Sequence, residues 1–457
     1  MPQRHLNPII MKTRRHHRTS LLLGLTFAAG AAMPVLAADD EVESWYAKFQ
    51  TTYIWQKKPG FDAPYTGPKS LITQSEKSYT LTADVYLGVR PWKDGEVYLN
   101  PELIQGVPLS HLSGLGGFSN GEVTRVAGPN PKIYGQHLFL RQTWNLGGGK
   151  EAVASDFNQL AGVVDKNRFV LTVGKFSLLD VFDDNAYAKD PRTQFMNAGN
   201  MTYTAFDYAA DARGYGWGFA GEWYRGDWVV RFGRLTGPRE PNGIPIDYQI
   251  GRHYGDQVEF EHAHEIGGQP GKVRLLLWRN RANLASFRDA LNYAAANPED
   301  PDHQYIFKVR NGEKFQYGVG VNVEQAISRN LGVFLRAMNT DGRTETYAFT
   351  EADASLATGL SLKGGAWGRA QDTVGLALLR NMLSPDRRDY LAAGGISFFI
   401  GDGALRYRPE TVFEGYYSLH VAKRVWLTAD YQRIENPAYN ADRGPVNIGS
   451  VRFHAEF

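Results

Sequence analysis

Segments of about ten residues in which polar and apolar side chains alternate recur along the chain from residue 43 to its last residue. Successive residues of a β-strand point to opposite faces, so this two-residue period predicts strands with one apolar and one polar face. Clear examples are 79–90, 315–326 and 425–432. We find no long stretch with the helical period of 3.6 residues. The pattern therefore predicts an all-β chain.

The predicted strands are joined by connections that alternate between long and short. This alternation is typical of a transmembrane β-barrel of the bacterial outer membrane, with short turns in the periplasm and long loops outside the cell. An even number of strands places both chain ends in the periplasm. We predict sixteen antiparallel strands at 43–54, 79–90, 96–105, 134–144, 167–176, 215–224, 228–235, 256–265, 272–281, 314–326, 331–341, 356–366, 372–382, 410–421, 425–434 and 446–457.

Two segments do not fit this alternation of connections. The segment 145–167 should be a short turn, yet it has more than twenty residues. The segment 177–214 could contain two further strands, which would give eighteen. A β-helix or a β-propeller would also show alternating strands, but these folds need a repeat of fixed period, which the chain lacks.

The two ends of the chain agree with an exported barrel. Residues 1–37 combine a basic start, a short apolar stretch and a small-residue cleavage site, so we predict a secretory signal peptide and one barrel domain at 38–457. The apolar stretch is shorter than the about 20 residues that a membrane helix needs. A last strand that ends on an aromatic residue is typical of outer-membrane barrels, and here Phe457 closes the alternation.

Composition excludes several classes of protein. The chain has no Cys, so it can form neither a disulfide framework nor a thiolate site. Residues 1–37 contain five basic and no acidic residues, so their removal changes the formal charge of the chain from +2 to −3. The remaining chain has no basic stripe that could bind nucleic acid. The mean hydropathy of −0.39, with 49 Gly, 24 Phe, 24 Tyr and 10 Trp, suits a barrel with lipid outside and water inside.

A barrel of sixteen strands is wide enough to leave an aqueous channel. The charged residues that the alternation predicts on its inner face are Asp84, Glu102, Arg141, Glu222, Arg231, Glu259, Glu261, Arg274, Glu324, Arg336, Asp430 and Arg452. A pore selective for one sign of ion would carry a ring of one sign, so this mixture predicts a lumen for neutral polar solutes. The residues predicted to face lipid include Leu81, Val85, Leu87, Val319, Val321, Leu427, Phe453 and Phe457.

Motifs for other chemistry are weak in this sequence. His262 and His264 share one strand face, but no third metal ligand accompanies them. The run 147–150 lacks the first glycine of a phosphate-binding loop, since Trp144 stands at that position. No serine lies in a nucleophile-elbow motif. We therefore predict no enzymatic activity, no metal and no cofactor.

Several sequence runs resemble a known family of channels. These are FDAPYTGPKSL at 61–71, GKFS at 174–177, DVFDDNAY at 180–187, DPRTQFMN at 190–197, PETVFEGYY at 409–417 and DYQRIENP at 430–437. In this order they are similar to the carbohydrate-selective porins of the OprB type, over residues 43–457. The resemblance implies a sixteen-stranded outer-membrane channel for the diffusion of mono- or oligosaccharides. Ala198 departs from the family, where we expect Trp, and this departure removes a possible stacking platform for sugars.

The segment 177–214 is the best candidate for a loop that folds into the bore and constricts it. Carboxylate, amide and guanidinium groups can fix sugar hydroxyls, and aromatic rings can cover the apolar faces of sugars. In the alternative interpretation, the loop groups bond local backbone, and the wall groups form a structural salt-bridge ladder. The predicted substrate-binding residues are Asp183, Asn185, Asp190, Arg192 and Gln194 on the loop, and Glu414, Asp430 and Gln432 on the wall.

The expected partners follow from the barrel and from the resemblance. They are permeating sugars, lipid and lipopolysaccharide of the outer membrane, the barrel assembly machinery through the C-terminal strand, and further copies of the chain. Nucleic acid is not expected. Two alternatives stay open, namely a channel that is general or serves another solute, and a barrel that exports polysaccharide.

Overall fold

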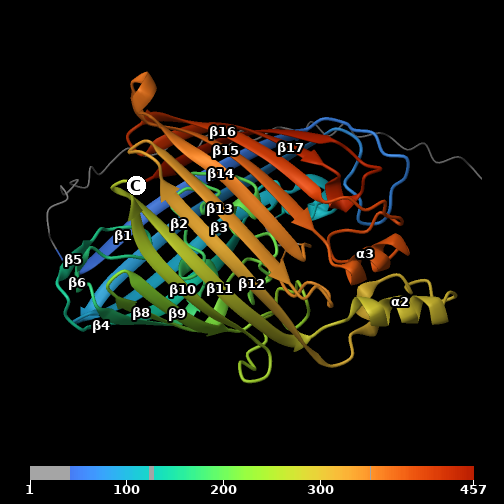
Figure 1. Ribbon diagram of the computed structural model, residues 1–457, viewed down its shortest axis with the longest axis horizontal. Helices are drawn as coiled ribbons and strands as arrows, with labels where there is room; N and C mark the ends of the chain where they lie inside the picture. Colours follow the sequence, from blue (N-terminus) through green and yellow to red (C-terminus); the bar gives the residue numbers. More distant parts are fainter. Residues whose placement is uncertain (1–41, 123–127, 350) are drawn as a thin grey trace, which may run out of the picture. The chain divides into compact units, whose positions relative to one another are not determined.

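Sixteen strands close into one antiparallel barrel in the computed structural model, which describes residues 42–122, 128–349 and 351–457 (Figure 1). The predicted signal peptide lies outside these residues. The strands are β1 (Trp45–Lys58), β2 (Glu76–Trp92), β3 (Gly95–Val107), β4 (Lys132–Asn145), β5 (Lys150–Val153), β6 (Gly162–Asp165), β7 (Arg168–Phe176), β8 (Gly216–Arg225), β9 (Trp228–Leu235), β10 (Tyr254–Ile266), β11 (Gln269–Asn283), β12 (Glu313–Ala326), β13 (Leu331–Thr340), β14 (Ala354–Gly364), β15 (Arg369–Met382), β16 (Glu410–Ala422), β17 (Val425–Glu435) and β18 (Val446–Glu456).

Each barrel strand pairs with its neighbours along the chain, and β1 pairs with β18 to close the barrel. The strands β5 and β6 are not part of the wall, so β4 pairs directly with β7. The prediction of a sixteen-stranded barrel is confirmed. The two further strands considered for 177–214 do not occur there, since its described residues contain only short helical turns.

The two ends of the barrel differ in the length of their connections. The end that we name the short-turn end has the connections 93–94, 226–227, 267–268, 327–330, 365–368 and 423–424. The opposite, long-loop end has the connections 59–75, 108–131, 177–215, 236–253, 284–312, 341–353, 383–409 and 436–445. Figure 1 shows the helices α2 and α3 at one end and the β5–β6 hairpin at the other.

The segment between β4 and β7 replaces a short turn by a second, smaller hairpin. Its strands β5 and β6 pair with each other, with Lys150 opposite Asp165. The residues between them, 154–161, form what we name the hairpin tip. This hairpin accounts for the excess length at 145–167 that the strand pattern alone left unassigned.

Short helices interrupt the connections. Ser286 and Ser384 accept backbone hydrogen bonds at the starts of α2 and α3, as N-cap residues do. No helix of the described part of the chain is long and apolar enough to cross a membrane. The helices are η1 (Leu109–Leu112), η2 (Leu178–Asp180), α1 (Ala198–Met201), α2 (Phe287–Ala296), η3 (Ile306–Val309), η4 (Gly365–Trp367), α3 (Pro385–Ala392) and η5 (Pro437–Tyr439).

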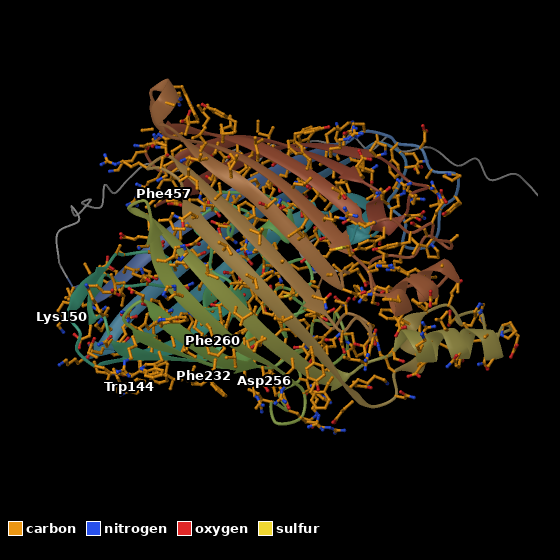
Figure 2. The ribbon with its side chains drawn as sticks, viewed as in Figure 1. Trp144, Lys150, Phe232, Asp256, Phe260 and Phe457 are labelled. Carbon is orange, nitrogen blue, oxygen red and sulfur yellow. The ribbon has the colours of Figure 1, made fainter. Side chains whose placement is uncertain are left out.

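The outer wall is apolar, and the charged residues of the wall that the alternation predicted inward face the lumen. Of the eight residues predicted to face lipid, Leu81 is half-buried and the other seven are between 36% and 60% exposed. Phe232 and Phe260 belong to the same outer surface (Figure 2). The predicted inward-facing charged residues are buried, apart from the half-buried Arg141 and Glu222. This pattern reverses that of a soluble protein, as lipid outside and water inside require.

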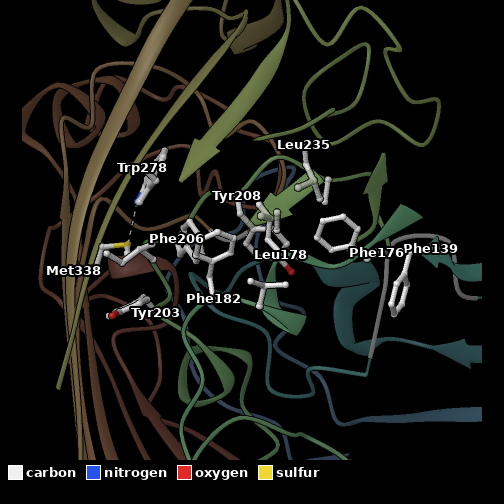
Figure 3. Close-up of a cluster of buried hydrophobic side chains, with 14 of the residues drawn as sticks. Phe139, Phe176, Leu178, Phe182, Tyr203, Phe206, Tyr208, Leu235, Trp278 and Met338 are labelled. Carbon is white, nitrogen blue, oxygen red and sulfur yellow. Dashed lines mark hydrogen bonds between the residues drawn. The ribbon is translucent and has the colours of Figure 1, made fainter. Parts of the chain in front are cut away.

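The barrel interior also contains a cluster of apolar side chains, drawn in Figure 3. Phe182, Tyr203 and Phe206 come from the segment 177–215 and pack against wall residues such as Trp278 and Met338. The indole Nε1 of Trp278 lies 3.4 Å from Sδ of Met338. The loop therefore brings apolar side chains into the lumen, and a second apolar cluster joins Phe195 of the same loop to wall residues such as Phe334 and Tyr416.

Candidate functional site

The connection between β7 and β8 crosses the interior of the barrel. Residues on it bond to side chains of β2, β3, β10, β12, β13, β16, β17 and β18. These strands lie on several sides of the closed wall, so the segment must run through the bore rather than over its rim. The segment begins with Ser177, which caps η2 together with Asp180.

Arg192 ties this loop to three carboxylates. Its Nη1 donates to Oδ2 of Asp84 at 2.6 Å, and its Nη2 to Oε1 of Glu102 at 3.0 Å. Its Nε donates to Oε2 of Glu122 at 2.8 Å. The side chain of Arg192 is only 12% exposed. The fork of donors thus locks the loop to β2, to β3 and to the connection 108–131.

Asp183 and Asn185 are buried and bonded to other residues of the protein. Oδ1 of Asp183 accepts from Nε of Arg336 at 3.0 Å and from Nδ2 of Asn322 at 2.5 Å. The backbone N–H of Asp183 donates to Oε2 of Glu259 at 2.8 Å, while Nδ2 of Asn185 donates to Oδ1 of Asn322 at 2.8 Å. These four hydrogen bonds, to Arg336, Asn322 and Glu259, hold a sharp bend, since Asp183 has a φ of 56°.

The wall residues Glu414 and Gln432 hold the next part of the loop. Oε1 of Glu414 accepts from the backbone N–H groups of Met196 and Asn197 at 2.5 and 3.1 Å. Oε2 of Glu414 accepts from Nδ2 of Asn200 at 2.6 Å. Oε1 of Gln432 accepts from Nδ2 of Asn197 at 3.0 Å. Both wall residues are fully buried, so they anchor the loop and do not face open space.

The remaining predicted residues differ in exposure. Asp430 is buried and accepts from Nε2 of Gln432 at 3.3 Å. Asp190 and Gln194 are half-buried, and the carboxylate of Asp190 accepts from the backbone N–H of Arg192 at 2.8 Å. Gln194 donates through Nε2 to the backbone carbonyl of Ala186 at 2.9 Å. All eight residues therefore belong to one network around the loop, and their binding of sugar stays a prediction.

Two cavities lie between this loop and the short-turn end. The Trp426 cavity has a volume of about 660 Å³ and is lined in part by Tyr187, Thr193, Gln194, Arg329, Lys363, Trp426 and Glu456. The Arg231 cavity has a volume of about 580 Å³ and is lined in part by Glu96, Arg141, Arg168, Asp184, Lys189, Glu222, Tyr224 and Arg231. Only Gln194 of the eight predicted residues lines either one. Of the other lining residues, the alternation pattern indicated Arg141, Glu222 and Arg231 alone.

The hairpin tip fills part of the bore from the short-turn end. The ring of Phe157 lies 4.4 Å from that of Tyr86, whose hydroxyl accepts from Nη1 of Arg192 at 3.3 Å. The backbone N–H of Leu160 donates to the hydroxyl of Tyr98 at 2.9 Å, and Nη1 of Arg141 donates to the carbonyl of Asn158 at 2.9 Å. The tip therefore reaches the same wall region as the loop. No periodic signal in the sequence indicated this contact.

An aromatic pocket of about 90 Å³ lies on the long-loop side of α1. Phe118, Phe206 and Tyr208 line it together with Phe349 and Phe399. Ala198 lines it too, so the aromatic surface here comes from residues other than position 198. We name it the Phe206 pocket.

Burial and nearby cations shift the pKa values of two carboxyl groups of the loop. Burial favours a high pKa for the Asp184 carboxyl, but Lys189 at 2.7 Å and Arg274 hold its pKa well below the usual range. Among the described residues, Asp207 forms no salt bridge. Burial raises its pKa to about 6, although the backbone N–H groups of Tyr347 and Ala348 donate to its carboxylate. Asp184 thus stays ionised in the Arg231 cavity, whereas Asp207 takes up a proton in mild acid.

Residues 69–457 match the sequence model of one family, the carbohydrate-selective porins of the OprB family. The chain belongs to this family. It is an integral outer-membrane porin, selective for carbohydrates, and not an enzyme. Its short-turn end is therefore periplasmic and its long-loop end extracellular.

Solved structures share the barrel of this porin. The structure of Pseudomonas putida OprB at high pH is 14% identical, with a TM-score of 0.68, over 91% of this chain and 94% of that one. Acinetobacter baumannii OccAB1 is 10% identical, with a TM-score of 0.47, over 92% of this chain and 98% of that one. The first comparison supports the sixteen-stranded porin fold. A search of curated protein sequences finds no match.

Proposed function

We propose that sugars cross this porin past the connection 177–215, which narrows the bore while Arg192, Asp190 and Gln194 border the passage. The observation that carries this proposal is the fixation of the loop by Arg192 on one side and by Glu414 on another. In this proposal, Asp183, Asn185, Glu414, Asp430 and Gln432 keep the loop in place and touch the solute little. Their burial among protein partners supports that division of roles.

The chemistry of the three spaces suits a neutral polyhydroxylated solute. Rings in the Phe206 pocket offer apolar faces at the extracellular entrance. Arg141, Arg168 and Glu222 in the Arg231 cavity offer donors and acceptors for hydroxyls. Cations and carboxylates line the same cavities, so neither sign of ion is strongly favoured. Contacts of this kind are weak and numerous, as rapid passage requires.

Reconstituted channels should therefore show weak ion selectivity and a small conductance that soluble saccharides reduce on titration. The physical reason is the mixed charge of the lumen and the competition of sugar hydroxyls for its polar groups. Reversal potentials in a salt gradient and single-channel recordings with increasing saccharide measure both properties. A strong preference for anions without any saccharide effect would instead favour a channel for another solute.

The C-terminal strand is proposed to be the contact with the barrel assembly machinery. Its last residue, Phe457, exchanges backbone hydrogen bonds with Phe49 at 3.0 and 2.7 Å, while the residue as a whole is 60% exposed. Replacement of Phe457 by Asp keeps these backbone bonds but should sharply reduce assembly in the outer membrane. Heat-modifiable protein in membrane fractions measures assembly, and Phe457→Tyr is the matched control. An equal amount of folded Phe457→Asp protein would contradict this assignment.

Two further proposals concern the ends of the chain and its copies. We propose that residues 1–37 are removed on export, so that N-terminal sequencing of the mature protein should find residue 38 as its first residue.

We also propose that copies of the barrel associate through the apolar outer wall. Chemical cross-linking of intact outer membranes tests this association, and a product of one-chain mass alone would count against it.

A further inference from the structure

A groove on the outer wall lies near the extracellular end of β8 to β12. Its volume is about 640 Å³, and Phe219, Phe232, Ile250, Val258, Leu277 and Tyr317 line it. Three of these side chains, those of Phe232, Leu277 and Tyr317, are 40% to 50% exposed. The groove opens on the surface that meets lipid, because inward and outward residues alternate along each strand.

A row of charged side chains crosses the extracellular part of this groove. Arg234 of β9 lies opposite Asp256 of β10, and Asp256 lies opposite Arg279 of β11. Nε and Nη2 of Arg234 donate to the two carboxylate oxygens of Asp256 at 2.6 and 2.9 Å. Nε of Arg279 donates to Oδ2 of Asp256 at 2.9 Å. Figure 2 shows Asp256 on the outer face near Phe232 and Phe260.

This row leaves an excess of positive charge. One carboxylate orients two guanidinium groups, and the Nη1 groups of Arg234 and Arg279 take part in none of these bonds. A second set lies closer to the extracellular rim, where Glu313 pairs with both Arg252 and Arg281. Together the four arginines pair with two carboxylates, and His253 lies between Glu313 at 3.5 Å and the carboxylate of Asp247 at 2.6 Å. Arginine is the side chain best suited to phosphate because it presents several donors in a fixed plane.

We propose that this groove binds a phosphorylated glycolipid of the outer leaflet. A phosphate of its headgroup lies on Arg234 and Arg279, and an acyl chain lies along Phe232, Val258 and Leu277. The groove matches such a lipid at both ends of the lipid molecule. The cations of the groove lie toward the extracellular rim, where the headgroup lies, and its apolar lining lies deeper in the membrane, where the acyl chain lies. A second copy of the chain fits less well, because a two-fold contact would oppose two arginine-rich clusters.

Lipid binding by the purified, folded porin tests the proposal. The probe is lipopolysaccharide with both phosphates on its lipid A, and the comparison probe is the same lipid after enzymatic dephosphorylation. Native mass spectrometry measures the lipid that remains bound. We expect the phosphorylated form to bind the unmodified porin, and the double variant R234Q/R279Q to bind it roughly tenfold or more weakly.

The variant R433Q is the matched control. Arg433 also faces outward near the extracellular end, on β17, and pairs with Glu435 at 2.8 Å, but it does not line the groove. It should bind lipid like the unmodified porin. The single variant R279Q leaves the Arg234–Asp256 pair intact and replaces the double variant if the latter does not fold. Equal binding by R279Q and the unmodified porin, or equal binding of both lipid forms, would overturn the proposal, as would cross-links that place another copy of the chain over the groove.

Discussion

Sugar flux through the porin should rise when Arg192 is replaced by alanine. The change leaves Asp84, Glu102 and Glu122 close together without the cation that they share. Loss of one partner from such a buried ion-pair network costs on the order of 3–5 kcal/mol. We therefore expect the loop to detach from β2 and β3 and the passage to widen. Liposome swelling with saccharides of increasing size measures this change.

Barrel assembly should survive this substitution. Arg336 still donates to Asp183, and Arg452 still donates to the carbonyls of Pro191 and Gln194 at 2.8 Å, so other anchors of the loop remain. The matched control is Arg192→Lys, which keeps the charge but loses the fork of donors and should give an intermediate flux. Unchanged flux in folded Arg192→Ala protein would show that the loop does not limit passage at this point.

A larger effect on conductance is expected when residues 146–167 are replaced by Asn-Gly. Asn145 and Arg168 already lie opposite each other at the end of the β4–β7 pair, and two residues of this type suffice to join antiparallel strands. The replacement removes Phe157 and Leu160 from the bore. Single-channel conductance should increase severalfold, and half-blocking saccharide concentrations should rise, because one wall of the Arg231 cavity is lost.

The point substitution Phe157→Ala measures how much of this increase comes from the ring of Phe157 alone and how much from the rest of the hairpin. It deletes the ring against Tyr86 but keeps β5 and β6, so it should give only part of the increase. Heat-modifiability of both variants shows that the barrel is intact. If the shortened porin conducts like the unmodified one, the hairpin tip does not lie in the path of ions.

The strands and their faces could be predicted because a barrel wall imposes a strict two-residue period on the chain. Val319 and Val321 face lipid, and Arg336 and Arg452 face inward, as the alternation predicted. The ten-residue helix α2 was missed, since it lies within a long loop that the strand pattern left unassigned. The hairpin tip could not be predicted either, because Tyr86 and Tyr98, its partners, are far from it in sequence.

The candidate site was predicted in part. The sequence indicated a loop rich in Asp, Asn and Arg that enters the bore, and the structure shows such a loop inside the barrel. The same residue types serve for binding a solute and for anchoring a loop, so composition could not separate the two roles. Glu414 and Gln432 bond to the loop and are buried, whereas Trp426 and Lys363 line open space. Only the three-dimensional arrangement distinguishes these two groups.

The apolar cluster of Figure 3 has a consequence for how pore width can change in evolution. A wide barrel with a water-filled interior has only its strand pairs to resist distortion of its cross-section. Here Phe182 lies against Gly233 of β9, and Phe206 packs against Trp278 of β11 with ring centroids 5.9 Å apart, so the segment that narrows the bore also stiffens this part of the wall. Substitutions that replace these rings by small side chains would widen the bore but also let the wall flex. Permeability would rise, and the current through the open channel would fluctuate more. The width of the bore is therefore more freely varied at the periplasmic hairpin, whose removal takes Phe157 and Leu160 from this cluster but leaves Phe182 and Phe206 in place.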